Sequence, residues 1–147
     1  MTKDDTEQYE KTICLWLNGF LDFRLDWVGD ENTFYDLRGM TPNNNKCVIE
    51  IKVRQKYYKD KMIEKYKYDK LMSLPDDVVK LYYVNDPKGA YIYWLNNIEL
   101  PKLESIRCPS TTMWSQDRKD KEVYLLPERL ASLVEFATPH KPEDFNY

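Results

Sequence analysis

The segment KCVIEIKVR, residues Lys46 to Arg54, is the part of the sequence that decides the fold. Its β-branched residues predict a strand, and Asn43 to Asn45 before it predict a turn. Because side chains alternate across a strand, Glu50 and Lys52 point to the same face of the sheet. A carboxylate and an ammonium group are costly to bury there unless they pair or bind a ligand. The simpler alternative is an edge strand whose solvated face carries both residues and Arg54.

Asp36 is a second acidic residue that can reach this strand. The run Asn32–Tyr35 predicts a strand that continues through Asp36, and Gly39, Pro42 and the asparagines predict the turn that follows. A hairpin closed by this turn brings Asp36 close to Glu50. Two neighbouring carboxylates repel each other, so the pKa of one should rise unless a cation lies between them. Two carboxylates, a backbone carbonyl and water suit Mg²⁺ or Mn²⁺.

The sequence resembles the PD-(D/E)XK nuclease superfamily, which has the restriction-endonuclease-like fold. The resemblance lies in Asp36, followed after a spacer by Glu50-Ile51-Lys52. Tyr35 stands where the name of the first motif has proline, a position that varies within the superfamily. The resemblance implies that Asp36 and Glu50 bind the metal ion, with the Ile51 carbonyl as a further ligand. It also implies that Lys52 positions or activates the attacking water, or stabilises the charged phosphate.

The first helix is expected over Asp5–Arg24, with Asp5 or Thr6 as its N-cap. Its apolar residues recur at helical spacing and form one stripe: Ile13, Trp16, Leu17, Phe20 and Leu21. Extended backwards, this stripe places Glu10 on the core face. The resemblance implies that an acidic residue of this helix completes the metal site, and Glu10 is the candidate. The alternative for Glu10 is a solvated acid favoured by the helix dipole.

The other elements complete a single three-layer α+β domain of αβββαβ order, the core of the restriction-endonuclease-like fold. The expected elements are strands at 25–28, 34–37 and 46–54, a helix at Asp60–Leu74, and strands at 78–84 and 90–95. The resemblance covers about residues 5–100. Residues 101–138 form an expected extension, with a strand at 122–126 and a helix at Glu128–Ala137 that Pro127 begins. Residues 139–147 are expected to be a flexible tail.

The composition of the 147-residue chain excludes several classes of site and compartment. Its three cysteines lack metal-type spacing, which predicts reduced thiols in a cytoplasmic protein. The one histidine, His140, lies between prolines near the C-terminus, which argues against a zinc site or a histidine-based triad. The N-terminus has no signal-peptide pattern, and no apolar run is long enough to cross a membrane.

The charge distribution predicts a nucleic-acid-binding surface beside the candidate site. Between Lys46 and Lys70 there are nine basic and four acidic residues, a net charge of +5, although the whole chain carries −3. Tyrosines lie between these charges, a combination that suits contacts with phosphates and bases. The residues expected to contact nucleic acid are Arg54, Lys56, Lys67 and Lys70. The alternative is a solvated helix face.

These observations predict a small metal-dependent nuclease that cleaves DNA, with RNA left open as a substrate. A homodimer with two sites would cut both strands. One rival is an inactive nuclease-fold protein that binds nucleic acid or a protein partner, as an inhibitor or accessory factor. Another is an α+β interaction module in which the motif is accidental. The small size would suit a phage or mobile-element product, which is an analogy only.

Overall fold

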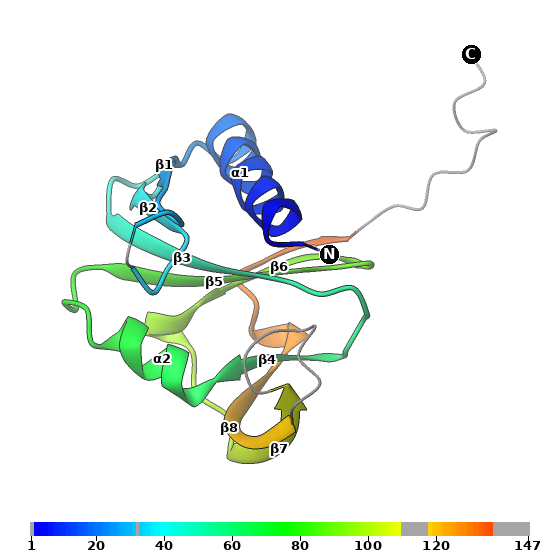
Figure 1. Cartoon of the computed structure of the whole chain (residues 1–147). Helices are drawn as coiled ribbons and strands as arrows, with labels where there is room; N and C mark the ends of the chain where they lie inside the picture. Colours follow the sequence, from blue (N-terminus) through cyan, green and yellow to red (C-terminus); the bar gives the residue numbers. More distant parts are fainter. Residues whose placement is uncertain (1, 32, 110–117, 137–147) are drawn as a thin grey trace.

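A computed structural model describes residues 2–31, 33–109 and 118–136 (Figure 1). The elements, in chain order, are α1 (Lys3–Phe20), β1 (Arg24–Trp27), β2 (Leu37–Met40), β3 (Lys46–Val53), β4 (Asp60–Glu64), α2 (Lys65–Met72), β5 (Val79–Asp86), β6 (Gly89–Trp94), η1 (Leu95–Asn97), β7 (Leu103–Pro109), β8 (Arg118–Pro127), η2 (Glu128–Leu130) and β9 (Leu133–Phe136). The expected tail at 139–147 lies outside the described residues.

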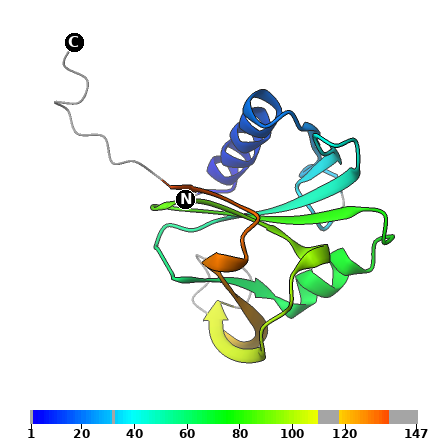
Figure 2. The same ribbon diagram turned by 180° about the vertical axis from the view of Figure 1, so that it is seen from behind.

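The main sheet has six strands in the order β1-β2-β3-β5-β6-β9. Strands β3 and β5 are parallel, and the remaining neighbours are antiparallel. Helix α1 covers one face of this sheet (Figure 1), and the reverse view shows α2 on the opposite face with the small sheet β4-β8-β7 (Figure 2). The structure is therefore the predicted three-layer α+β arrangement.

Strand β3 divides the core into two halves. Ile49 and Ile51 pack in the cluster that contains Ile13 and Leu17 of α1. Val48 packs on the other face, in the cluster that contains Leu71 of α2. Because the alternation places Glu50 and Lys52 on the face of Val48, both side chains lie on the α2 side of the sheet. β3 pairs with β2 and with β5, so the edge-strand alternative is wrong.

The predicted αβββαβ order is confirmed, with local shifts at the first elements. Helix α1 begins earlier than expected, because Thr2 is its N-cap and forms a capping box with Asp5. Strand β2 begins after Asp36 and contains Gly39, which was expected in the turn. A Cβ atom at Gly39 would lie 1.9 Å from the carbonyl oxygen of Arg24, so the approach of β1 to β2 requires glycine there.

One predicted helix is shorter than expected, and another is wrong. Residues Asp60–Glu64 form β4, in which Lys61 and Ile63 are buried alternately and pair with β8, so α2 begins only at Lys65. The expected helix Glu128–Ala137 is instead η2 followed by β9, which covers the outer edge of β6. Strand β7, within the expected extension at 101–138, was not predicted from the sequence.

The structure bears on two predictions made from composition, those on the cysteines and on membrane-spanning segments. Cys14 and Cys47 are buried free thiols. None of the helices in the described residues is long and apolar enough to cross a membrane.

Candidate active site

The candidate site lies where β2 and β3 separate. The two strands pair from Leu37 with Ile49 towards the turn, and the last backbone contact before they part is the N–H of Asp36 donating to the Ile49 carbonyl at 2.9 Å. Beyond this point the β2 side of β3 has no strand neighbour within the described residues. The N–H and C=O of one strand residue point to the same side, so the Ile51 carbonyl faces this opening.

Asp36 is held at the opening by the backbone of β3. Its Oδ2 accepts a hydrogen bond of 2.8 Å from the N–H of Ile51. Burial, followed by the negative charges of Glu50 and Glu10, raises the pKa of Asp36 to about 8. The structure therefore brings Asp36, Glu50 and Glu10 within electrostatic reach of one another, as the sequence predicted for Asp36 and Glu50.

Glu50 is buried in β3 and is paired with Lys67. Its Oε1 accepts a hydrogen bond of 3.0 Å from Lys67 Nζ, which comes from the first turn of α2. Burial raises the pKa of Glu50 despite this cation. For Lys67, burial acts to lower the pKa, but the attraction of Glu50 outweighs it and the pKa is raised. Lys67 was predicted to contact nucleic acid, whereas here it contacts a candidate metal ligand.

Lys52 lies next to Glu50 on the same face of β3 and has an altered acidity. Burial, assisted by the positive charges of Arg54 and Lys67, lowers its pKa to about 8. Its ammonium group can therefore lose or regain a proton close to neutral pH.

Glu10 reaches the site from α1, on the core face that the sequence predicted. It is buried, and its Oε1 accepts a hydrogen bond of 3.0 Å from Trp27 Nε1. Burial raises the pKa of Glu10 above its usual range, and the charge of Glu50 adds to this effect. The alternative of a solvated acid at the start of the helix is therefore wrong.

Glu64 is a site neighbour that the sequence did not reveal. It ends β4, and its Oε1 accepts from Lys121 Nζ of β8 at 3.0 Å. Burial acts to raise the pKa of Glu64, but Lys121, Lys67 and Lys52 outweigh it and lower the pKa. Its position depends on β4 being a strand, and the predicted helix at 60–74 concealed this.

The donor set tests whether a metal ion fits. No group of three or more His, Cys, Asp or Glu side chains is placed to hold a metal ion anywhere in residues 2–31, 33–109 and 118–136. The candidates at the opening are instead the carboxylates of Asp36 and Glu50 and the Ile51 carbonyl. All three are oxygen donors. This chemistry suits a hard divalent ion that also keeps water ligands.

Comparisons with known proteins support the fold. No family model matches the chain, and no curated protein matches its sequence. A solved structure does match: Hjc, a Holliday junction resolvase from the hyperthermophilic archaeon Archaeoglobus fulgidus, with a TM-score of 0.54 and 12% identity over 92% of each chain. The chain has the restriction-endonuclease-like fold.

The restriction-endonuclease-like fold places the predicted nucleic-acid contacts in two groups. Arg54 and Lys56 line a hollow of about 550 Å³ between the end of β3 and the small sheet. Lys70 lies exposed on α2, with its Nζ 4.5 Å from the ring centre of Tyr66. Arg107 of β7 also lines the hollow, a basic residue that the sequence did not connect with the site.

The replacement Asp36→Asn is expected to stabilise the metal-free protein. When the pKa of a carboxyl group is higher in the folded than in the unfolded protein, the folded protein loses stability as the pH rises between the two pKa values. For Asp36 these are about 3.9 in the unfolded chain and about 8 in the folded chain. Asparagine removes the charge and can still accept from the Ile51 N–H. Calorimetric unfolding at pH 8 without divalent ions should show a melting temperature roughly 3–10 °C higher than wild type. The difference should shrink towards pH 5.

The matched control is Asp30→Asn at an exposed acid. It should change the melting temperature by less than about 1 °C, as exposed substitutions usually do. An Asp36→Asn protein that is less stable than wild type at pH 8 would show that its carboxylate is not electrostatically unfavourable in the folded chain.

Proposed function

We propose that this protein is a divalent-metal-dependent nuclease that hydrolyses phosphodiester bonds in DNA, with RNA left open as a substrate. The observation that supports this is the group of Asp36, Glu50 and Lys52 at the opening between β2 and β3. Two carboxylates with raised pKa values lie beside a lysine with a lowered pKa. Shifted pKa values of this kind cluster at catalytic sites.

Asp36, Glu50 and the Ile51 carbonyl would hold Mg²⁺ or Mn²⁺. Bound there, the ion would supply an activated water and neutralise charge that develops on the phosphate. Glu10 would add negative charge to the site and can complete it through its oxygen that does not bind Trp27. Glu50 would be shared between the ion and Lys67, because the Lys67 ammonium now contacts its Oε1.

Lys52 would act on the attacking water or on the phosphate. Its pKa of about 8 lets it accept a proton from water near neutral pH and then stabilise the anionic phosphate as a cation. Arg54 and Lys56 would hold the phosphate backbone of the substrate beyond it. A homodimer would supply two such sites and would cut both strands.

The second candidate function is a nuclease-fold protein that binds without cleaving. The ion pair between Lys67 and Glu50 favours it, because an ammonium group can replace the metal ion permanently in an inactive relative. In that case nucleic acid or a protein partner would bind without hydrolysis, and divalent ions would not affect the site.

Calorimetric titration with Mn²⁺ separates these two functions. A nuclease should bind Mn²⁺, and Glu50→Gln should weaken binding by at least about tenfold because a charged ligand is lost. Lys67→Met should tighten binding by roughly three- to tenfold, because the competing cation is removed. Glu104→Gln, at an exposed acid of β7, is the control and should bind like wild type. Absence of Mn²⁺ binding by both wild type and Lys67→Met would favour the non-cleaving protein.

A further inference from the structure

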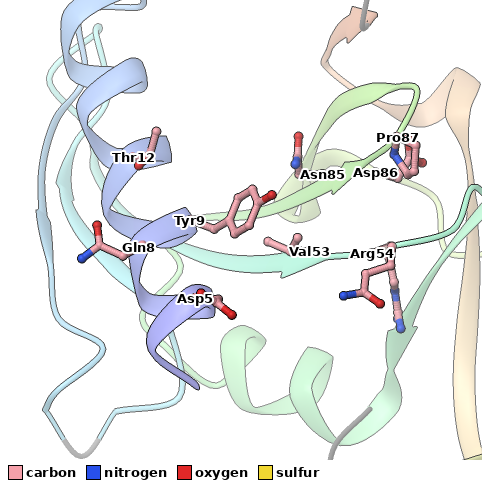
Figure 3. A pocket seen from close by; sticks show the side chains of 10 residues that line it. Asp5, Gln8, Tyr9, Thr12, Val53, Arg54, Asn85, Asp86 and Pro87 are labelled. Carbon is pink, nitrogen blue, oxygen red and sulfur yellow. The ribbon is translucent and has the colours of Figure 1, made fainter. Parts of the chain in front are cut away.

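A second hollow, of about 740 Å³, lies on the opposite face of the sheet from α2 (Figure 3). It is bounded by the first half of α1, by Arg54 and Gln55 after β3, and by the β5–β6 turn at Asp86 and Pro87. Its volume is in the range of small-molecule sites. None of the candidate metal ligands lines it, so it is distinct from the site described above.

An exposed aromatic ring enters this hollow. The side chain of Tyr9 is 47% exposed. Figure 3 shows its ring extending from α1 over Val53 towards Asn85. In the described parts of the chain it stacks on no other aromatic ring. A flat, accessible π-face of this kind is where a planar ligand can stack.

Three amide residues line the hollow: Gln8, Gln55 and Asn85. Each carries both a hydrogen-bond donor and an acceptor. Among the described residues, none of the three has a side-chain hydrogen bond to another part of the protein. The hollow therefore presents neutral polar groups that can pair with the edge of a heterocyclic ligand.

The two acids of the hollow are already bound to the protein. Asp5 accepts the N–H of Thr2 at 2.9 Å in the capping box. Asp86 accepts from Lys61 Nζ at 2.9 Å and from the N–H groups of Lys88 and Gly89. The charge of Asp86 is thus compensated by Lys61, and Asp5 is held in the capping box of α1, which argues against a metal ion or an organic cation as the occupant.

Arg54 connects the hollow to the candidate active site. It follows Lys52 by two residues and lies close enough for the two positive charges to interact. Arg54 also lines the hollow of about 550 Å³ between the end of β3 and the small sheet, on the other side of the main sheet. A phosphate bound by Arg54 would therefore lie at the rim of the neutral, aromatic hollow.

We infer that this hollow receives the unstacked base of a nucleotide next to the cleaved phosphate, with the base stacked on Tyr9 and its edge bonded by the amides. The inference rests on the proposed function and adds a substrate class to it. A base inside a duplex is paired and stacked on both sides, so it cannot enter. Strands with unpaired nucleotides are therefore the preferred ligands.

The test is the affinity of a short single-stranded oligonucleotide carrying the fluorescent base 2-aminopurine, measured by anisotropy in Ca²⁺ without cleavage. Tyr9→Ala should weaken binding roughly 5- to 150-fold, the effect of losing one stacked base, and Tyr9→Phe should bind like wild type. When the same oligonucleotide is annealed to its complement, Tyr9→Ala should lower the affinity for the duplex by less than about twofold. The reason is that phosphate contacts dominate the binding of a duplex. Phe20→Ala, an exposed aromatic at the other end of α1, is the matched control and should have no effect.

The 2-aminopurine signal gives a second readout. Stacking on Tyr9 should quench its fluorescence, and Tyr9→Ala should abolish the quenching. The inference would be overturned if wild type and Tyr9→Ala bound the single strand equally well. It would also be overturned if Tyr9→Ala weakened binding of duplex and single strand by the same factor, or if wild type bound neither. Cleavage that is independent of Tyr9 would leave the proposed function standing without the base site. Tyr9-dependent binding without cleavage in Mn²⁺ would support the base site and contradict the proposed nuclease function.

Discussion

Cleavage of supercoiled plasmid in Mg²⁺ or Mn²⁺ is expected to fall roughly 10²- to 10⁴-fold when Lys52 is replaced by alanine. The reason is that no other described lysine shares its position beside Glu50 on β3 with a pKa lowered to about 8. Lys67, the nearest other ammonium group, is bound to Glu50 and has a raised pKa, so it is a poor replacement. Initial rates under single-turnover conditions measure the loss directly.

Two controls accompany this experiment. Asp36→Ala should lose as much activity as Lys52→Ala, although it removes a metal ligand rather than the proton carrier. Lys65→Ala removes an exposed lysine that is ion-paired with Asp69 on α2 and should cleave like wild type. Equal cleavage by all three variants would identify the activity as a contaminant.

The replacement Lys61→Met is expected to destabilise the fold by about 3–5 kcal/mol. Lys61 and Asp86 are 2% and 1% exposed, and Lys61 Nζ donates to Asp86 Oδ2, to Glu128 Oε1 and to the carbonyl of Tyr58. Its ammonium group also lies 4.1 Å from the ring centre of Tyr91. Methionine fills the space but leaves the Asp86 carboxylate buried without its cation.

Thermal unfolding should show a melting temperature roughly 6–20 °C lower for Lys61→Met. The double variant Lys61→Met/Asp86→Asn should recover part of the loss, because asparagine keeps an acceptor for the turn N–H groups without a buried charge. Lys65→Met, in an exposed pair, should change stability by less than about 0.5 kcal/mol. A Lys61→Met protein as stable as Lys65→Met would show that this buried network does not stabilise the fold.

The sequence predicted the central part of the fold because two simple periodicities are strong there. The helical stripe of α1 and the apolar alternation of β3 each have one interpretation, and both elements are where they were expected within a few residues. The hairpin between β2 and β3 also followed from its turn residues. These elements are sufficient to bring Asp36, Glu50 and Glu10 together.

The errors concern segments whose structure depends on distant partners. Asp60–Glu64 has no helix or strand signal of its own, and it becomes a strand because β8, which lies far along the chain, pairs with it. Leu133–Phe136 fits a helical stripe equally well, but the open edge of β6 selects a strand. Local pattern contains neither partner, so no propensity argument could have placed these two strands.

The same limit explains what was missed at the candidate site. Lys67 was grouped with the basic residues because its charge is visible in the sequence, whereas its partner Glu50 lies on another element. Glu64, Lys121 and the aromatic hollow around Tyr9 depend on the placement of β4, β8 and the β5–β6 turn. Sequence reasoning therefore found the residues on β3 and beside it, but not the groups that later strands bring to them.

The most direct test of the central claim is cleavage of plasmid and single-stranded DNA by purified wild-type protein in Mn²⁺, before and after addition of EDTA, with Glu50→Gln in parallel. The nuclease interpretation predicts cleavage that requires the metal, stops with EDTA and is lost in Glu50→Gln. No cleavage of either substrate by wild-type protein, together with no Mn²⁺ binding, would contradict it and leave a nuclease-fold protein that binds without cutting.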